Sequence, residues 1–305
     1  MKKSIKIILF IFLLFSLWYL FVKPSDYIIN FESKSLPGTI NQSIKLWGKG
    51  LKSTTVLKQE DPNNILQTFA FSDSVHDYHW SIIPIHDSLS KVSVRVKDNN
   101  LKNSIINRLK VPFVKTDFVK RSEKTVYNFM TVLKDHVDNF KVNIVGYEET
   151  PNKMLAYVNL SSEQYLKGQG MMDNNNFIAD MLFKNKIELD GPPMLEVLHW
   201  NQEKDSITYN FGFPIKQMDT LPNLGEIKYK KLAKQKALKA IFNGNYISSD
   251  RAWYALMNYA KKNNIILKEN PLEVFQNNPH MGGDSSKWVA EIYMPIDTSS
   301  TTGPF

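Results

Sequence analysis

An internal repeat in the C-terminal half limits the folds that this chain can adopt. Residues 193–197 read PMLEV and residues 270–274 read NPLEV. Each motif is followed about 20 residues later by an apolar-Pro-Ile triplet, at 213–215 and 294–296. Internal self-similarity of this kind indicates a duplicated supersecondary unit. We therefore expect two similar units in this half of the chain.

The elements that precede each motif complete the pattern. A strand-like stretch and then a helix-like stretch come first, at 154–160 and 177–184 in the first copy and at 236–242 and 250–262 in the second. Each copy thus reads strand–helix–strand–strand, which buries only one face of its own sheet. Pairing the copies, about 142–216 and 228–297, into one sheet with the helices on one side buries both apolar faces.

The second copy also resembles a known family. Residues 240–246 read AIFNGNY, residues 272–275 read LEVF, and residues 288–296 read WVAEIYMPI. This pattern resembles the bacterial transcription activator effector-binding domain, also called the gyrase-inhibitor-like domain. The resemblance spans about 142–297 and is strongest over 237–297. It implies binding of hydrophobic, often cationic compounds in a groove between the two repeats, and some members are hydrolases. Many members are fused to DNA-binding domains, and we find none in this sequence.

Glu273 is the ligand-binding acid that this resemblance implies. It occupies the family's Glu-x-aromatic position, where a buried carboxylate faces the groove. A carboxylate in an apolar pocket attracts a lipophilic cation strongly, because little water screens the charge. Strand alternation places Glu273 and Phe275 on one face, so Phe275 is a candidate ligand contact as well. Phenylalanine at 275 lacks the hydroxyl of the more usual tyrosine, which argues against catalysis. The alternative is that Glu273 is a strand residue facing solvent.

Five further residues are candidate contacts in the same groove. Tyr246 and Trp253 are candidate wall residues, although Trp253 also lies on the apolar stripe of a helix and fits a core position. Glu291 and Tyr293 share a strand face, and Glu291 is either a ligand contact or a structural partner. Glu196, the first-copy echo of Glu273, would approach the groove from the opposite side under pseudo-twofold symmetry.

The N-terminus predicts a membrane anchor at residues 1–23. An apolar run over 7–22 approaches the ~20 residues that cross a bilayer core, and it follows three lysines. A cleaved signal peptide is the alternative, but no small-x-small cleavage site lies between Tyr19 and Pro24. The lysines predict a single-pass protein of the cytoplasmic (inner) membrane, with its body on the periplasmic or extracytoplasmic side.

Residues 24–141 predict a separate domain. A strand-like stretch at 26–33 precedes a helix start at Pro37, four strand-like stretches and a long helix with an apolar stripe from Val126 to Phe140. Ser122 is the expected N-cap of that helix. This order resembles START-like (polyketide-cyclase-like) helix-grip domains, in which a curved sheet wraps a long helix. The resemblance implies an α+β fold and allows a cavity for a lipid-like ligand.

Several classes of site are absent from the sequence. The chain has no cysteine, which excludes disulfides and thiolate metal sites. His76 and His79 are an odd number of residues apart in a strand-like stretch, so we expect no metal site. Phosphate loops, dinucleotide fingerprints and nucleophile elbows are also missing, so we expect no cofactor. An exported body would meet no nucleic acid, and its net charge of +8 fits a solvated surface.

These patterns predict a non-catalytic, membrane-anchored protein that binds a hydrophobic or amphipathic small molecule. The family resemblance implies that the ligand can also be a cation. Two alternatives stay open. One is a hydrolase in the same groove with Glu273 or Glu291 as general base, and the other is a ligand-free interaction platform. The expected architecture is α+β: a transmembrane helix, a START-like helix-grip domain, a duplicated effector-binding domain over 142–297, and a disordered tail at 298–305.

Overall fold

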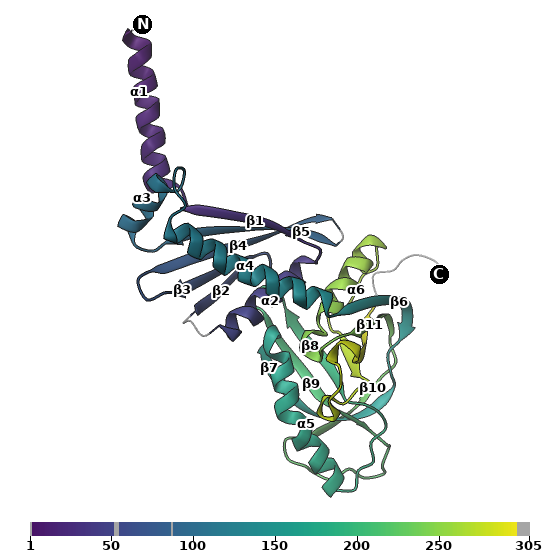
Figure 1. Ribbon diagram of the computed structural model, residues 1–305. Coiled ribbons are helices and arrows are strands. Elements are labelled where there is room, and N and C mark those ends of the chain that lie inside the picture. Colours follow the sequence, from purple (N-terminus) through teal and green to yellow (C-terminus); the bar gives the residue numbers. More distant parts are fainter. Residues whose placement is uncertain (1, 52–54, 87, 298–305) are drawn as a thin grey trace. The chain divides into compact units, whose positions relative to one another are not determined.

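The computed structural model describes residues 2–51, 55–86 and 88–297, so the tail predicted at 298–305 lies outside the described residues. Within them the chain forms six α-helices and two antiparallel β-sheets, which confirms the α+β class. The chain divides into two compact units, residues 1–135 (unit 1) and 136–305 (unit 2). Figure 1 labels their elements.

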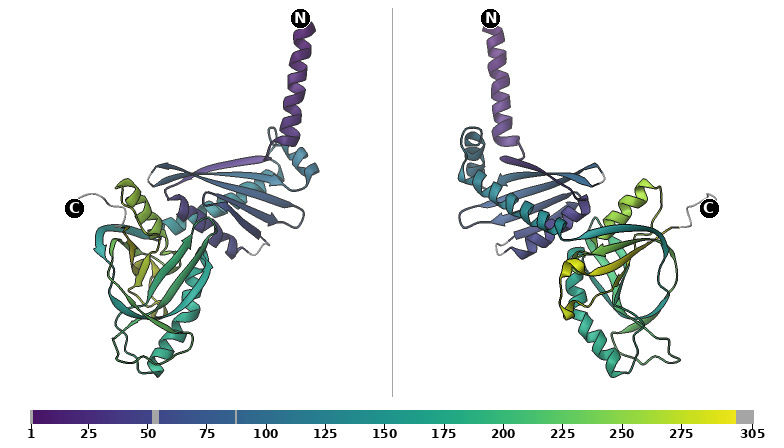
Figure 2. Two further views of the ribbon diagram at one scale, coloured as in Figure 1. Left: turned by 180° about the vertical axis from the view of Figure 1, so that it is seen from behind. Right: turned by 45° about the vertical axis from the view of Figure 1, so that its right-hand side comes forward.

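Unit 1 begins with the apolar segment. Helix α1 (Lys2–Leu17) continues into a π-helical turn, η1 (Trp18–Val22). The 20 residues from Lys3 to Val22 are long and apolar enough to cross a membrane, and none of the most apolar window is buried against the protein. Figure 2 shows α1 standing clear of the sheet of unit 1. An unburied helix of this composition is stable only in an apolar medium or against a partner.

The sheet of unit 1 has five antiparallel strands in the order β1-β5-β4-β3-β2. The strands are β1 (Tyr27–Ser33), β2 (Thr55–Asp61), β3 (Asn64–Ala70), β4 (Val75–His86) and β5 (Leu89–Asp98). Buried and exposed residues alternate along β3 and β5, because one face of the sheet carries the core. Helix α2 (Pro37–Gly50) starts at Pro37 as the sequence predicts, since a proline in the first turn loses no hydrogen bond.

Helices α2 and α4 (Asp117–Asp138) pack on this apolar face. Phe129 of α4 contacts Trp47 of α2 and Trp80 of β4, with ring centroids 5.3 and 5.0 Å apart. Ser122 is not the N-cap that the sequence predicts. It lies inside α4 and donates to the carbonyl oxygen of Phe118, and Thr116 Oγ1 caps the helix by accepting from the Val119 amide. The START-like assignment itself stays a prediction.

One helix of unit 1, α3 (Leu101–Lys110), is not among the elements predicted from the sequence. Its N-cap is Asn100, whose side chain accepts a hydrogen bond from the Asn103 amide. Its apolar residues Leu101, Ile105 and Leu109 recur at helical spacing, but Leu101 and Leu109 are exposed, so this spacing does not mark a buried face.

Unit 2 contains an eight-stranded antiparallel sheet in the order β10-β7-β9-β8-β12-β13-β11-β6. The strands are β6 (Lys141–Glu149), β7 (Lys153–Glu163), β8 (Met194–Asn201), β9 (Ser206–Ile215), β10 (Lys228–Leu232), β11 (Lys236–Asn243), β12 (Leu272–Phe275) and β13 (Val289–Pro295). The order is symmetric about the β8–β12 pair. In addition, β6 precedes β7 in the chain but pairs with β11, and β10 precedes β11 but pairs with β7. The two halves therefore exchange their first strands.

Helices α5 (Lys167–Lys184) and α6 (Arg251–Lys262) cover one face of this sheet, where Ile178 and Leu182 of α5 and Trp253 and Leu256 of α6 enter one core. A smaller apolar cluster lies on the other face, around Leu272, Val274 and Tyr293. The sheet is strongly curved (Figure 2).

The Leu-Glu-Val echo is not a structural equivalence. Leu195 packs in the core beneath the helices, whereas Leu272 belongs to the cluster on the opposite face. Leu195 is paired directly with Glu273 across β8 and β12. A one-residue offset between the copies moves every side chain to the other face of a strand. Glu196 and Glu273 therefore lie on opposite faces of the sheet.

We expect Gly212→Ala to destabilise unit 2, because a Cβ at this position of β9 would lie 1.9 Å from the carbonyl oxygen of Ala156 on β7. Overpacking of this kind costs about 1–3 kcal/mol, measurable by chemical denaturation. Gly50→Ala is the control, since its Cβ would meet nothing within 4 Å. Equal stability of the two variants would contradict the strand register described here.

Candidate ligand-binding site in unit 2

A cavity of about 290 Å³ opens between helix α5, the short helix η3 (Tyr246–Ser248) and strand β12. No charged side chain is among the described residues that line it, and most of its wall is apolar. The lining residues are Gly168, Met171, Met172, Asn175, Pro193, Phe211, Asn245, Tyr246, Ile247, Phe275, Asn277, Pro279 and Trp288. Binding cavities for small organic molecules typically have this mostly apolar composition.

The aromatic wall of the cavity is fixed by hydrogen bonds. Tyr246 Oη donates to the Val289 carbonyl oxygen at 2.8 Å and accepts from the Asn277 amide at 2.9 Å. Its ring lies 4.8 Å from that of Phe275 and 5.4 Å from that of Trp288, centroid to centroid. Because these rings are held in place before a ligand arrives, binding loses little side-chain entropy. Tyr246 and Phe275 thus lie where the sequence analysis expects wall residues.

Glu273 lies on the same face of β12 as Phe275 but does not line the cavity. Its side chain is fully buried, and its carboxylate accepts from Lys167 Nζ at 2.7 and 2.8 Å. Ser249 Oγ donates to the same carboxylate at 2.8 Å and Trp253 Nε1 at 2.7 Å. The expectation of an acid open to an external cation is therefore not met, because a lysine of the chain already pairs with it.

The charge of this pair is enclosed within the domain. Burial raises the pKa of the Glu273 carboxyl above its ordinary value, and the ammonium of Lys167 opposes that shift. Lys167 Nζ also donates to Ser249 Oγ at 2.6 Å and lies 5.1 Å from the centroid of the Trp253 ring. Among the residues that the structure describes, the polar contacts of the pair come from unit 2 itself, which satisfies the condition for burying two charges.

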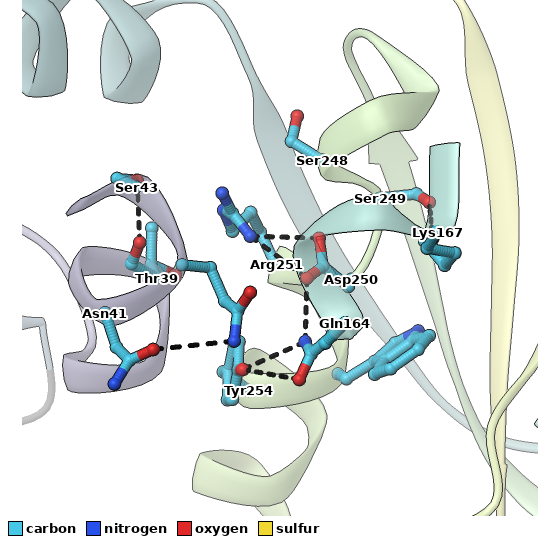
Figure 3. A network of polar contacts seen from close by, with 12 residues as sticks. Thr39, Asn41, Ser43, Gln164, Lys167, Ser248, Ser249, Asp250, Arg251 and Tyr254 are labelled. Atoms are coloured by element: carbon cyan, nitrogen blue, oxygen red, sulfur yellow. Dashed lines mark hydrogen bonds and ion pairs between the residues drawn. The ribbon is translucent and has the colours of Figure 1, made fainter. Parts of the chain in front are cut away.

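A second polar group lies beside the ion pair, at the start of α6. Gln164 Nε2 donates to Asp250 Oδ2 at 2.7 Å, and Gln164 Oε1 accepts from Trp200 Nε1 at 2.8 Å. Asp250 also binds Arg251 Nη1 at 3.0 Å. Figure 3 shows Gln164, Asp250, Arg251 and Tyr254 linked in this way, with Lys167 beside Ser249. These contacts hold the start of α6 against the segment that leads into α5.

The other predicted residues do not share this site. Trp253 is fully buried and acts as a donor to Glu273, so it is a core residue, as its position on the apolar stripe suggests. Glu291 and Tyr293 lie on the opposite face of the sheet, where Tyr293 Oη donates to Glu291 Oε2 at 2.5 Å and Lys239 Nζ lies 2.9 Å from the same oxygen. Burial raises the pKa of Glu291, but these two hydrogen bonds outweigh it, so the pKa lies below its ordinary value.

Glu196 also lies on that opposite face. Lys230 Nζ pairs with its carboxylate at 2.8 Å, and Asn210 Nδ2 donates to it at 2.8 Å. It lines a separate, more polar cavity of about 230 Å³. The seven predicted residues therefore fall into three places. Tyr246 and Phe275 line the cavity, Glu273 and its donor Trp253 are buried in the core, and Glu196, Glu291 and Tyr293 lie on the far face of the sheet.

Comparison with known proteins identifies the segment that builds this site. Residues 163–297 match the family described as the GyrI-like small molecule binding domain. This match confirms the predicted gyrase-inhibitor-like resemblance over those residues. It covers both helices of unit 2 and every residue that lines the cavity.

Several solved structures are similar to part of the chain at low identity, and no curated protein matches the chain. The C-terminal domain of EcmrR is 18% identical over 52% of this chain and 98% of its own, with a TM-score of 0.43. SAV2435, solved with bound tetraphenylphosphonium, is 13% identical over 52% and 94%, with a TM-score of 0.35. A hydrolase from Listeria innocua is 10% identical over 50% and 92%, with a TM-score of 0.33.

We expect Lys167→Met to destabilise the protein by about 3–5 kcal/mol, because it leaves the buried carboxylate of Glu273 without a cation. The double variant Lys167→Met/Glu273→Gln should recover much of this loss, since the neutral amide can still accept from Trp253 Nε1 with its oxygen and donate to Ser249 Oγ with its NH2 group. Chemical denaturation of the single and double variants measures the coupling. Strictly additive losses would show that the two residues do not act as a pair.

Proposed function

We propose that unit 2 binds an uncharged, hydrophobic small molecule in the cavity beside η3. The observation that carries this proposal is an apolar cavity whose nearby acid is already neutralised by Lys167. The match of residues 163–297 to a small-molecule binding domain supports the same function. The ligand would be held by contact with the rings of Tyr246, Phe275 and Trp288 and with the methionines of α5.

The ion pair supports a neutral ligand over a cationic one. A ligand cation would need to displace the Lys167 ammonium from Glu273 or remain in a cavity without a charged partner. The first route leaves the ammonium of Lys167 buried without a partner, and the second removes the charge of the ligand from water without supplying one. The family resemblance alone favours cations, so the presence of Lys167 changes the expected ligand class.

The contacts of the acids favour binding over catalysis. A general base must lie within hydrogen-bonding reach of the substrate proton or of a water molecule. Glu273 is fully buried and accepts from three side chains, and Glu291 is held by Tyr293 and Lys239 on the other face. An open cavity of about 290 Å³ also favours a ligand-binding role over a platform with a collapsed groove.

We further propose that the segment Lys3–Val22 anchors the protein in the cytoplasmic membrane with its body outside the cytoplasm. Its length and apolar composition support the anchor, and the N-terminal lysines support the orientation. A second, lipid-like ligand in unit 1 has less support, because Trp47, Trp80 and Phe129 pack together between the sheet and its helices.

A substitution at the cavity mouth tests the proposed site. Met172 lines the cavity and is half exposed, so Met172→Trp should fill the cavity without disturbing the core. We expect at least a tenfold loss of affinity, about 1.4 kcal/mol, for any neutral apolar compound that raises the melting temperature of the wild type. Phe183→Trp is the matched control, since Phe183 is an exposed residue of the same helix outside the cavity wall. Equal affinity in both variants would place the ligand elsewhere.

A second measurement tests the ligand class. Tetraphenylphosphonium should not stabilise the wild type, whereas Lys167→Met should gain stabilisation, because Glu273 then lacks an internal cation. Binding at 100 times the dissociation constant adds about 2.7 kcal/mol, visible as a rise in melting temperature. Lys230→Met, which removes the partner of Glu196 on the other face, is the control and should gain nothing. Strong stabilisation of the wild type by the cation would overturn the neutral-ligand proposal.

A further inference from the structure

Helix α3 has the reverse of the usual polarity. Leu101 and Leu109 are 63% and 53% exposed, whereas Ser104, Asn107 and Arg108 are 0%, 8% and 2% exposed. A helix on the surface of a soluble domain normally buries its apolar stripe and presents polar residues to water. The exposed face of α3 therefore suits contact with an apolar surface or medium.

The buried polar face is explained by its partner, Asp26. Ser104 Oγ donates to Asp26 Oδ1 at 2.7 Å, and Arg108 Nε binds the same oxygen at 2.7 Å. Because Asp26 is itself buried, its charge requires these donors. The helix is therefore held with its leucines outward by specific polar contacts.

The chain after α3 extends the apolar surface. Phe113 is 86% exposed and Val114 is 59% exposed. Lys102 and Lys110 are exposed on the same helix. We call Leu101, Leu109, Phe113 and Val114 the α3 patch. Large apolar side chains bordered by lysines are typical of surfaces that rest in the headgroup region of a bilayer.

The α3 patch is tied to the end of the apolar N-terminal segment. Arg108 Nη1 donates to the carbonyl oxygens of Leu20 at 2.9 Å and Tyr19 at 3.3 Å. Tyr19 Oη donates in return to the Arg108 carbonyl oxygen at 3.1 Å. Figure 2 shows α3 beside the C-terminal end of α1, where the chain leads into β1. These contacts fix the patch where an anchor formed by Lys3–Val22 would leave the membrane.

We propose that the α3 patch is a second membrane contact, which inserts into the headgroup region of the bilayer that the N-terminal segment crosses. This inference rests on the proposed anchor. Insertion removes four apolar side chains from water, and the ammonium groups of Lys102 and Lys110 reach anionic headgroups while their stems cover apolar surface. Unit 1 would then be held against the membrane by two contacts instead of by the N-terminal segment alone.

The absence of cysteine makes the test direct, since any introduced cysteine is the only labelling site in the chain. Phe113→Cys in the full-length protein is labelled with an environment-sensitive fluorophore. The protein is then reconstituted in vesicles of phosphatidylcholine and phosphatidylglycerol with plain or brominated acyl chains. Insertion to a depth of about 5–10 Å should bring the label within quenching range, and we expect roughly a twofold loss of fluorescence in the brominated vesicles.

Two further positions make the outcomes distinguishable. Leu13→Cys reports whether the N-terminal segment is in the bilayer. Ile85→Cys is the matched control, because Ile85 is 48% exposed and lies near the turn between β4 and β5. At this turn β5 pairs with the C-terminal end of β1, the end far from the anchor.

Quenching at residues 13 and 113 but not at 85 supports the proposal. Quenching at residue 13 alone overturns it while leaving the anchor intact, and the α3 patch would then be assigned to a protein partner. No quenching at residue 13 would remove the anchor and this inference together, without bearing on the cavity of unit 2.

Discussion

The ion pair between Lys167 and Glu273 joins the two halves of unit 2, since Lys167 belongs to α5 of the first half and Glu273 to β12 of the second. Both side chains are fully removed from water. A buried charge without its partner costs several kcal/mol, so α5 must be docked over β12 whenever this unit is folded. The cavity takes Gly168 and Met171 from α5 and Phe275 from β12. The pair therefore holds together the two elements that form opposite walls of the site.

The same ion pair keeps the charge of Glu273 away from the proposed ligand cavity. The carboxylate that could attract a cation is used inside the domain, and its remaining hydrogen bonds go to Ser249 and Trp253. What reaches the cavity is a set of fixed rings and flexible methionines. Affinity would then come from the apolar area that a ligand buries and from how well its shape fits, with little contribution from electrostatic attraction.

Local patterns in the sequence predict most of this fold, and long-range pairing accounts for what they miss. Alternation and helical spacing reveal the strands of unit 1, the long helix α4 and the strand–helix–strand–strand order of unit 2. Helical spacing does mark α3, but it cannot show that the polar face of this helix is the buried one, because that depends on the contacts of Ser104 and Arg108 with Asp26. Lys167 is not predicted from the sequence either. Nothing near it in the chain distinguishes it from a surface lysine, and its partner Glu273 is 106 residues away. Glu196 lies on the far face of the sheet and not in the groove, because a one-residue offset between the copies reverses the face of a strand.

The exchange of β6 and β10 has a consequence for where this domain begins. The family match starts at residue 163, the last residue of β7, so β6 and nearly all of β7 lie upstream of it. Yet β7 pairs with both β9 and β10, and β6 covers the edge of β11. A fragment cut at the family boundary would leave the edges of β9, β10 and β11 with unpaired main-chain groups, which invite association with other chains. Strand pairing therefore sets the smallest fragment of this domain that we expect to be soluble. That fragment begins at β6, some twenty residues before the start of the family match.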